Sequence, residues 1–150
     1  MIKKSNMNDE YVIEEQVGYL LRRTYFHHLT IFQQSLDETR LTSVQFAVLY
    51  AINKLKECSQ KELVEETGID QATIRGIIQR LKDKLFISQD PDQHDKRKVL
   101  IHITASGIQE LSQAIPIAAS ISDLTLAALN PAEKIALKFL LKKILGHPLD

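Results

Sequence analysis

The basic residues best suited to bind a polyanion gather in one stretch of the chain, from Gln71 to Lys98. This stretch carries 7 basic and 4 acidic residues, whereas the whole chain of 150 residues balances 19 against 19. It ends in three consecutive cations, Lys96, Arg97 and Lys98, and cations grouped in this way bind the phosphates of nucleic acids. The net charge excludes no partner, but the uneven distribution predicts where a DNA-binding surface would lie.

A second set of polar side chains opens the same stretch. Asp70 is a residue type that caps helix N-termini, and Gln71, Thr73 and Arg75 follow it, outside the apolar stripe of a helix predicted over 71–85. Side chains on the first turns of a helix can reach base edges in the major groove of DNA. These three residues are therefore predicted to read bases. The cations that extend the basic side of this helix, and that are predicted to lie against phosphate, are Arg80, Lys82 and Lys84.

The three consecutive cations fall at the tip of a predicted hairpin. Segments 86–89 and 98–103 have the composition of short strands, and the segment between them, 90–97, is polar and charged and contains a proline. A positive finger of this kind can enter the minor groove of DNA. Lys96, Arg97 and Lys98 are therefore predicted to contact DNA as well.

Two shorter helices are predicted before the basic stretch. Thr42 with Gln45, and Ser59 with Glu62, have the spacing of a capping box, in which side chain and backbone at a helix start bond each other reciprocally. Gly68 supplies the left-handed turn after the second of these helices. Helix, short helix, turn, helix and two-stranded hairpin, in that order, predict a mainly α fold containing a winged helix-turn-helix.

Long apolar helices are predicted on both sides of this unit. One covers residues 10–36, which is more than a small monomeric core needs. Another begins after Thr104 and continues past Pro116 with a kink or a break, and a last one begins at Asn130 and ends near 146. These flanking helices are expected to associate with something outside the unit.

Four segments resemble the MarR family of bacterial transcription regulators, and the resemblance extends over nearly the whole chain. The segments are DQHDKR at 92–97, LIHITASG at 100–107, SQKEL at 59–63 and RLKDK at 80–84. The first is similar to the family's D-x-x-D-x-R wing and the second to its strand ending in T-x-x-G. The resemblance implies a single chain with a winged helix-turn-helix DNA-binding unit at 42–103 and dimerisation helices at 10–36 and 104–146.

The resemblance also implies roles for two residues of the wing. Arg97 corresponds to the wing-tip arginine, and Asp95 to the acid that orients it and so supports the wing. One position departs from the pattern, because the family usually has glycine where this sequence has Leu85. The helix that ends there is therefore expected to close in a different way.

Polar residues interrupt the apolar face of the first helix, and two interpretations of them stay open. Arg23, Thr24 and His28 lie within two turns, and His28 is either a core histidine bonded by the protein or part of a pocket. Arginine can bond both oxygens of a carboxylate, and the sequence around these residues and Phe46 is similar to that of family members that respond to aromatic carboxylates. Arg23, Thr24, His28 and Phe46 are the residues predicted to bind such an effector.

Several other classes of protein do not fit the sequence. It has no phosphate-binding glycine loop, nucleophile elbow or zinc-hydrolase motif, so no enzymatic activity, no cofactor and no metal is expected. The single cysteine, Cys58, is expected to be structural rather than a redox sensor, because an acidic neighbour disfavours its thiolate. Neither a signal peptide nor an apolar run of membrane-spanning length is found, which predicts a cytoplasmic location.

These observations predict a homodimeric DNA-binding regulator, expected to act as a repressor on a pseudo-palindromic operator of double-stranded DNA and to be released by a small anionic aromatic effector. The alternative is a winged-helix protein that assembles with another protein and does not read DNA. The three consecutive cations of the hairpin tip favour the first interpretation.

Overall fold

A computed structural model of the chain describes residues 11–35 and 40–148, and the structural statements that follow concern these residues. The elements in chain order are η1 (Ile13–Glu15), α1 (Val17–Gln34), α2 (Ser43–Leu55), β1 (Glu57–Cys58), α3 (Gln60–Thr67), α4 (Gln71–Asp83), β2 (Ile87–Pro91), β3 (Val99–Ile103), α5 (Ala105–Thr125) and α6 (Pro131–Ile144). The predicted mainly α fold with a winged helix-turn-helix is confirmed.

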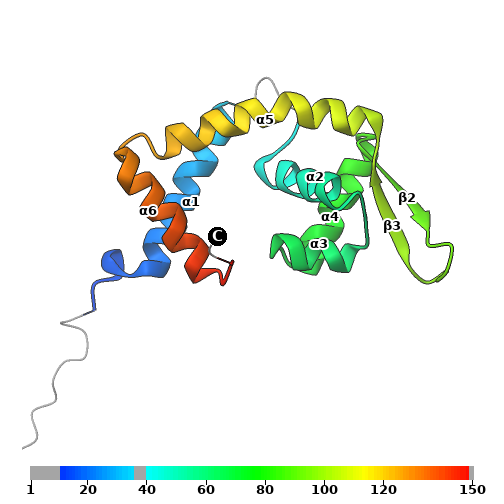
Figure 1. The fold of residues 1–150 in the computed structure, drawn as a ribbon, viewed down its shortest axis with the longest axis horizontal. Helices are drawn as coiled ribbons and strands as arrows, with labels where there is room; N and C mark the ends of the chain where they lie inside the picture. Colours follow the sequence, from blue (N-terminus) through cyan, green and yellow to red (C-terminus); the bar gives the residue numbers. More distant parts are fainter. Residues whose placement is uncertain (1–10, 36–39, 149–150) are drawn as a thin grey trace, which may run out of the picture.

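The long helix α5 connects two groups of elements (Figure 1). At one end it continues from the sheet and lies over α2; at the other end it lies beside α1, and the chain then turns into α6. α5 is one helix through Pro116, so the predicted continuation is confirmed and no break occurs there. No helix that the structure describes is long and apolar enough to cross a lipid bilayer.

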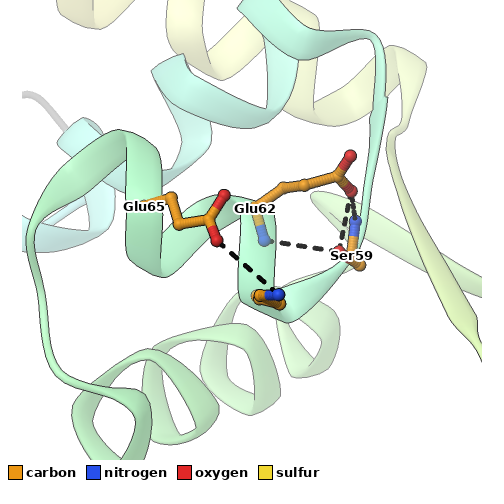
Figure 2. A network of polar contacts seen from close by, with 4 residues as sticks. Ser59, Glu62 and Glu65 are labelled. Carbon is orange, nitrogen blue, oxygen red and sulfur yellow. Dashed lines mark hydrogen bonds and ion pairs between the residues drawn. The ribbon is translucent and has the colours of Figure 1, made fainter.

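The helix starts follow the predicted caps. The backbone N–H of Gln45 donates to Thr42 Oγ1, and Gln45 Oε1 accepts from the Thr42 N–H, both at 3.2 Å. Figure 2 shows the same reciprocal arrangement between Ser59 and Glu62, where the Ser59 N–H donates to Glu62 Oε2 at 2.7 Å. These hydrogen bonds lower the pKa of Glu62, because they stabilise its charged form. Asn130 closes a third capping box at the start of α6.

The sheet has a third strand that the sequence pattern does not predict. β2 and β3 form the wing hairpin, and β1 pairs antiparallel with the other edge of β3, with Glu57 opposite His102 and Cys58 opposite Ile101. Because β1 is only two residues long, it shows no alternation of polar and apolar residues that could identify it. The predicted strand at 86–89 lies at Ile87–Pro91, two residues farther at its end.

The chain leaves α4 through a left-handed turn, although the residue there is a leucine. Leu85 has φ = 62°, its N–H donates to the Lys82 carbonyl (2.9 Å), and the N–H of Phe86 donates to the Leu81 carbonyl (3.0 Å). These two bonds form the Schellman motif that glycine usually closes. The expectation of a different closure is therefore wrong. Phe86 is fully buried. Its burial and the two hydrogen bonds together hold Leu85 in a conformation that is unfavourable for a residue with a Cβ.

The core of the winged helix-turn-helix lies where α2, α3, α4, the sheet and the start of α5 meet. Its largest fully buried side chains are Leu49, Ile52, Leu63, Ile74, Leu81, Phe86 and Ile101. α5 approaches the core through Gly107, because a Cβ on this residue would lie 2.1 Å from the Phe86 carbonyl oxygen. The N–H of Thr104 donates to the same oxygen at 3.0 Å, which fixes the start of α5 to the start of β2.

The first predicted helix is shorter than expected and interrupted. Gln16 has an extended backbone (φ −78°, ψ 135°) that separates η1 from α1, and both predicted ends, 10 and 36, lie outside the described residues. The apolar side chains of this region, such as Val17 (64% exposed), contact little of their own chain. Helical spacing alone does not hold a helix end in place when no surface packs against its apolar face.

Candidate nucleic-acid interface

Helix α4 presents one face to the core and the opposite face to solvent. Asp70 caps it by accepting the Thr73 N–H at 2.9 Å, and the isoleucines and leucine at 74, 77, 78 and 81 are buried. Gln71, Thr73 and Arg75 are exposed on the first turns, as are Arg80 and Lys82 on the last. The structure thus places all five of these predicted contact residues on accessible parts of one helix.

The hydroxyl of Thr73 is partly occupied by the cap. It donates to Asp70 Oδ2 at 2.6 Å, and this bond is the largest cause of the lowered pKa of Asp70. The hydroxyl has a single hydrogen, so only its lone pairs remain for a base. Thr73 can accept from an adenine or cytosine amino group, whereas Gln71 and Arg75 offer free donors.

A network of backbone hydrogen bonds shapes the tip of the wing. Asp92 Oδ1 accepts the N–H groups of His94 (2.7 Å) and Asp95 (3.2 Å), and the pKa of Asp92 is lowered by these bonds. The Asp92 N–H donates to the Lys98 carbonyl at 2.9 Å, which closes the loop. The tip is thus an ordered turn built by its own acidic residues.

Asp95 supports the wing tip through the backbone of Arg97. Asp95 Oδ1 accepts the Arg97 N–H at 3.0 Å, and the Asp95 carbonyl accepts the Lys98 N–H at 2.9 Å. The side chains of Lys96, Arg97 and Lys98 are exposed. The acid therefore fixes the chain beneath the arginine, while the guanidinium stays accessible.

Lys84 does not share the exposed position of the other cations on α4. Its ammonium donates to the Arg40 carbonyl and, at 2.9 Å, to Gln45 Oε1. Both partners belong to the segment around the start of α2. The prediction that Lys84 lies against phosphate does not agree with this geometry, because two of the three donors of its head group are used inside the protein.

A row of aromatic rings connects α1 with α2 and includes two of the predicted effector residues. The ring centroids of His28 and Phe32 are 6.3 Å apart, those of Phe32 and Phe46 are 6.4 Å apart, and those of Phe46 and Tyr50 are 6.2 Å apart. Phe46 and Tyr50 also line a pocket of about 330 Å³ with Ala47, Ala51, Glu66, Thr67 and Ile69.

His28 is held by α5. Its Nδ1 lies 2.8 Å from Thr125 Oγ1, and the Thr125 hydroxyl donates its hydrogen to the Ile121 carbonyl at 2.8 Å. The Thr125 oxygen must therefore accept from His28, so Nδ1 carries the proton and Nε2 is the acceptor nitrogen. Burial, and secondarily the neighbouring His27, lower the pKa of His28, which favours the neutral ring.

The other two predicted effector residues lie on the accessible side of α1. Thr24 is exposed, and the guanidinium of Arg23 lies 5.9 Å from the ring centroid of Tyr19 and bonds its hydroxyl at 3.4 Å. The structure brings His28 and Phe46 to the same aromatic row but does not bring Arg23 and Thr24 to it.

One polar site was missed by the sequence analysis. His102 on β3 lies between carboxylates of both neighbouring strands, with Nδ1 3.8 Å from Glu57 Oε2 and Nε2 3.9 Å from Asp90 Oδ2. The register that brings them together depends on the unpredicted strand β1. Among the residues that the structure describes, no group of three or more histidine, cysteine or acidic side chains is arranged to hold a metal ion.

Comparison with known proteins identifies the family of this arrangement. The profile described as "Transcriptional regulator SarA/Rot" matches residues 30–114. Over 138 residues, the chain is 44% identical to the HTH-type transcriptional repressor NicR of Pseudomonas putida, covering 92% of this chain and 87% of that protein. The chain belongs to the MarR family of winged-helix transcription regulators.

Solved structures of MarR-family proteins have the same fold. BpsR of Bordetella bronchiseptica, in a structure described as showing how 6-hydroxynicotinic acid regulates its DNA binding, is 42% identical with a TM-score of 0.86, covering 92% of this chain and 99% of that one. A variant of MarR from E. coli in complex with operator DNA has a TM-score of 0.81 at 24% identity, covering 90% and 99%, and supports the fold alone.

These relatives are regulators of transcription and not enzymes. This MarR-family chain is accordingly a DNA-binding regulator. Its winged helix-turn-helix presents the exposed side of α4 and the ordered wing tip to solvent.

Proposed function

We propose that the protein is a homodimeric repressor that occupies a pseudo-palindromic operator. The observation that carries this proposal is the placement of two cationic surfaces on one rigid unit: the exposed side of α4 and the wing tip at Lys96, Arg97 and Lys98. The other side of α4 is fixed to the core, so the exposed side has a defined orientation for the major groove.

Uncovered apolar side chains on α1 and α6 support the dimer. The structure describes no buried residue in α6, although this helix carries Ile135, Phe139, Leu140 and Ile144, each between 48% and 71% exposed. Apolar surface of this extent marks an interaction site. A second copy of the chain, packed through the same surface, would place two α4 helices for successive major grooves about 34–36 Å apart.

Each group of DNA-contacting residues has its own role in the proposal. Gln71, Thr73 and Arg75 read bases, and Arg80 with Lys82 lies against phosphate. The wing cations enter the neighbouring minor groove, with Asp95 supporting Arg97.

Selection and salt titration test this part of the proposal. The parent protein selects duplexes from a random 30-base-pair pool, and the affinity of the selected duplex is measured against salt concentration. Arg97→Ala is expected to reduce the slope of log K against log salt by about one unit, because one cation that neutralises the charge of the DNA is lost. Lys138→Ala removes the same charge from α6 and is the matched control. Equal slopes for the parent and Arg97→Ala would contradict the contact between the wing and DNA. If the parent selects no sequence, the alternative is favoured, in which the winged-helix protein assembles with another protein and does not read DNA.

An aromatic carboxylate is the proposed effector, bound between α1 and α2 beside the aromatic row. Phe46, which is only partly buried, offers a ring face for stacking, and His28 Nε2 can accept a hydrogen bond from a ring N–H or hydroxyl of the ligand. Arg23 and Thr24 lie outside the aromatic row, so the ligand carboxylate must extend to the accessible side of α1 for Arg23 to bond it. The effector of BpsR, 6-hydroxynicotinic acid, combines an aromatic ring, a carboxylate and such a donor, and BpsR is 42% identical to this chain.

Titration of a ligand series into the protein–operator complex tests the effector site. 6-Hydroxynicotinic acid is expected to release the operator, and benzoic acid, which lacks the second donor, to release it less. A tenfold decrease in operator affinity requires about 1.4 kcal/mol of coupling. His28→Ala and Arg23→Ala are expected to bind the operator but not to release it when the ligand is added. Lys138→Ala is the matched control. If both variants release the operator at the same ligand concentrations as the parent protein, the proposed effector site is contradicted.

A further inference from the structure

Arg40, between α1 and α2, contacts three other elements at once. Its N–H donates to Glu110 Oε1 on α5 at 2.7 Å, and its carbonyl accepts the Lys84 ammonium at the end of α4. Its guanidinium carbon lies 5.1 Å from the ring centroid of Phe86, next to the start of β2. Gln45 shares the Lys84 ammonium with the Arg40 carbonyl. We call this group of residues the Arg40 junction: Arg40, Gln45, Lys84, Phe86 and Glu110.

The partners of Lys84 in the Arg40 junction are themselves held in place. Gln45 is 5% exposed and uses its Oε1 both for the capping box of α2 and for the Lys84 ammonium. The other acceptor of Lys84, the Arg40 carbonyl, belongs to a residue whose N–H is held by Glu110, which is 8% exposed. A flexible lysine side chain that ends between two such fixed acceptors loses most of its freedom, so it works as a connection rather than as a solvated charge.

The end of α4 is also the place where the orientation of the wing is set. Leu85 and Phe86 follow Lys84 directly and lead into β2, and the Thr104 hydroxyl at the start of α5 donates to the Leu85 carbonyl at 2.7 Å. These bonds join α4, the wing and α5 at one point, which directly follows Lys84 in the chain.

We propose that Lys84 is a positioning residue for operator recognition: it fixes the C-terminal end of α4 to the start of α2 and does not contact DNA. This inference rests on the proposed operator binding. It assigns to Lys84 a role opposite to the phosphate contact that its charge and its place in the sequence suggest. Loss of its head group tilts α4, so base contacts weaken while phosphate attraction to the rest of the surface stays.

The same substitution at Lys84 and at Lys82 distinguishes a positioning residue from a residue that contacts phosphate. Lys84→Met and Lys82→Met each remove one charge from the last turns of α4 and keep a long apolar side chain. Affinity is measured for the selected operator and for a random duplex, against salt, at a temperature where circular dichroism shows each variant fully folded. Lys84→Arg, which retains donors for both oxygens, is the conservative variant.

Lys84→Met is expected to lower operator affinity at least fivefold, with random-duplex affinity and the salt slope at parental values. Lys82→Met is expected to weaken both duplexes and to reduce the slope by about one unit. Lys84→Arg is expected to recover most of the operator affinity. A purely structural role of Lys84 would change the melting temperature but not the operator-to-random ratio of the folded protein, and would overturn the inference.

Two other results would also overturn it: a slope reduced by about one unit in Lys84→Met, or an unchanged operator affinity. If Lys84→Met does not fold, Lys84→Gln, which keeps a polar head too short to reach both oxygens, is measured with the same expectations. If the parent selects no operator at all, the proposed function fails; if the parent selects one and the Lys84 variants match it, only this inference fails.

Discussion

The winged helix-turn-helix buries its apolar side chains, whereas α6 and the start of α1 leave theirs exposed. In the first, side chains such as Ile52, Leu63 and Ile74 are completely buried by the chain itself. In the second, Ile135 on α6 is 71% exposed and Val17 on α1 is 64% exposed. The first region therefore contains its own source of stability, whereas the second has apolar surface that becomes stabilising only when another surface covers it.

This difference indicates in which region stability depends on the protein concentration. A unit with a closed core unfolds independently of a partner, whereas association through α1 and α6 follows mass action. The sequence composition of the two regions does not reveal this, because both have the periodicity of amphipathic helices.

The largest expected effect is inside the closed core. Gly107→Ala places a Cβ 2.1 Å from the Phe86 carbonyl oxygen and 2.9 Å from Ile103 Cγ1, and the first of these atoms is backbone that cannot turn away. The free energy of unfolding is expected to fall by about 3 kcal/mol, as measured by urea denaturation. Gly76→Ala is the control: it is a helical glycine with no atom within 4 Å of its added Cβ, so stability is expected to rise by about 0.5–1 kcal/mol. Similar effects of the two substitutions would contradict the close approach.

The second largest effect is expected on the exposed apolar face of α6. Phe139→Glu places a charge on the apolar face of α6, where the parent residue is 48% exposed. The proposed dimer is expected to dissociate at micromolar concentration in sedimentation velocity, and operator affinity to fall about a hundredfold, equivalent to about 2.8 kcal/mol. Lys138→Glu, on the neighbouring position, is the control. A monomeric parent would contradict the proposed dimer, and loss of the far-ultraviolet dichroism of the variant would mean that the closed core also depends on α6.

A smaller effect is expected at the end of α4. Leu85→Gly removes the side chain from a residue with φ = 62°, where it is 73% exposed and contributes little burial. Stability is expected to rise by about 0.5–1 kcal/mol, which is the relief of left-handed strain less the greater unfolded-state entropy of glycine. Leu85→Ala keeps the Cβ and is expected to show no gain. A destabilised Leu85→Gly variant would mean that the leucine side chain has a packing role.

The smallest expected effect concerns the thiol in the closed core. Burial raises the pKa of Cys58 to about 11, with further contributions from Glu62 and Glu57, so almost no thiolate exists at pH 7. The native protein is expected to react with a disulfide reagent far more slowly than the protein in guanidinium, and peroxide treatment to leave operator binding unchanged. Rapid reaction of the native thiol would show that β1 opens and that the core is less closed than its burial indicates.

The sequence by itself determined the local structure and the location of the charged surfaces. The capping boxes at Thr42 and Ser59, the turn at Gly68 and the cationic wing tip depend on residues no more than four positions apart, so their spacing was sufficient to predict them. The resemblance of the wing and strand motifs to the MarR family also pointed to the correct family.

Only the tertiary structure decided which of these groups meet. Lys84 and Gln45 are 39 positions apart, and His28 and Thr125 are 97 positions apart, so no local pattern shows that they bond each other. The strand β1 exists because the edge of β3 accepts it, and Leu85 is left-handed because Phe86 is buried beside it. Local spacing decides which elements form, but packing decides whether a lysine points to DNA or to a carbonyl, because the cost of an unpaired buried group is set by its neighbours in space.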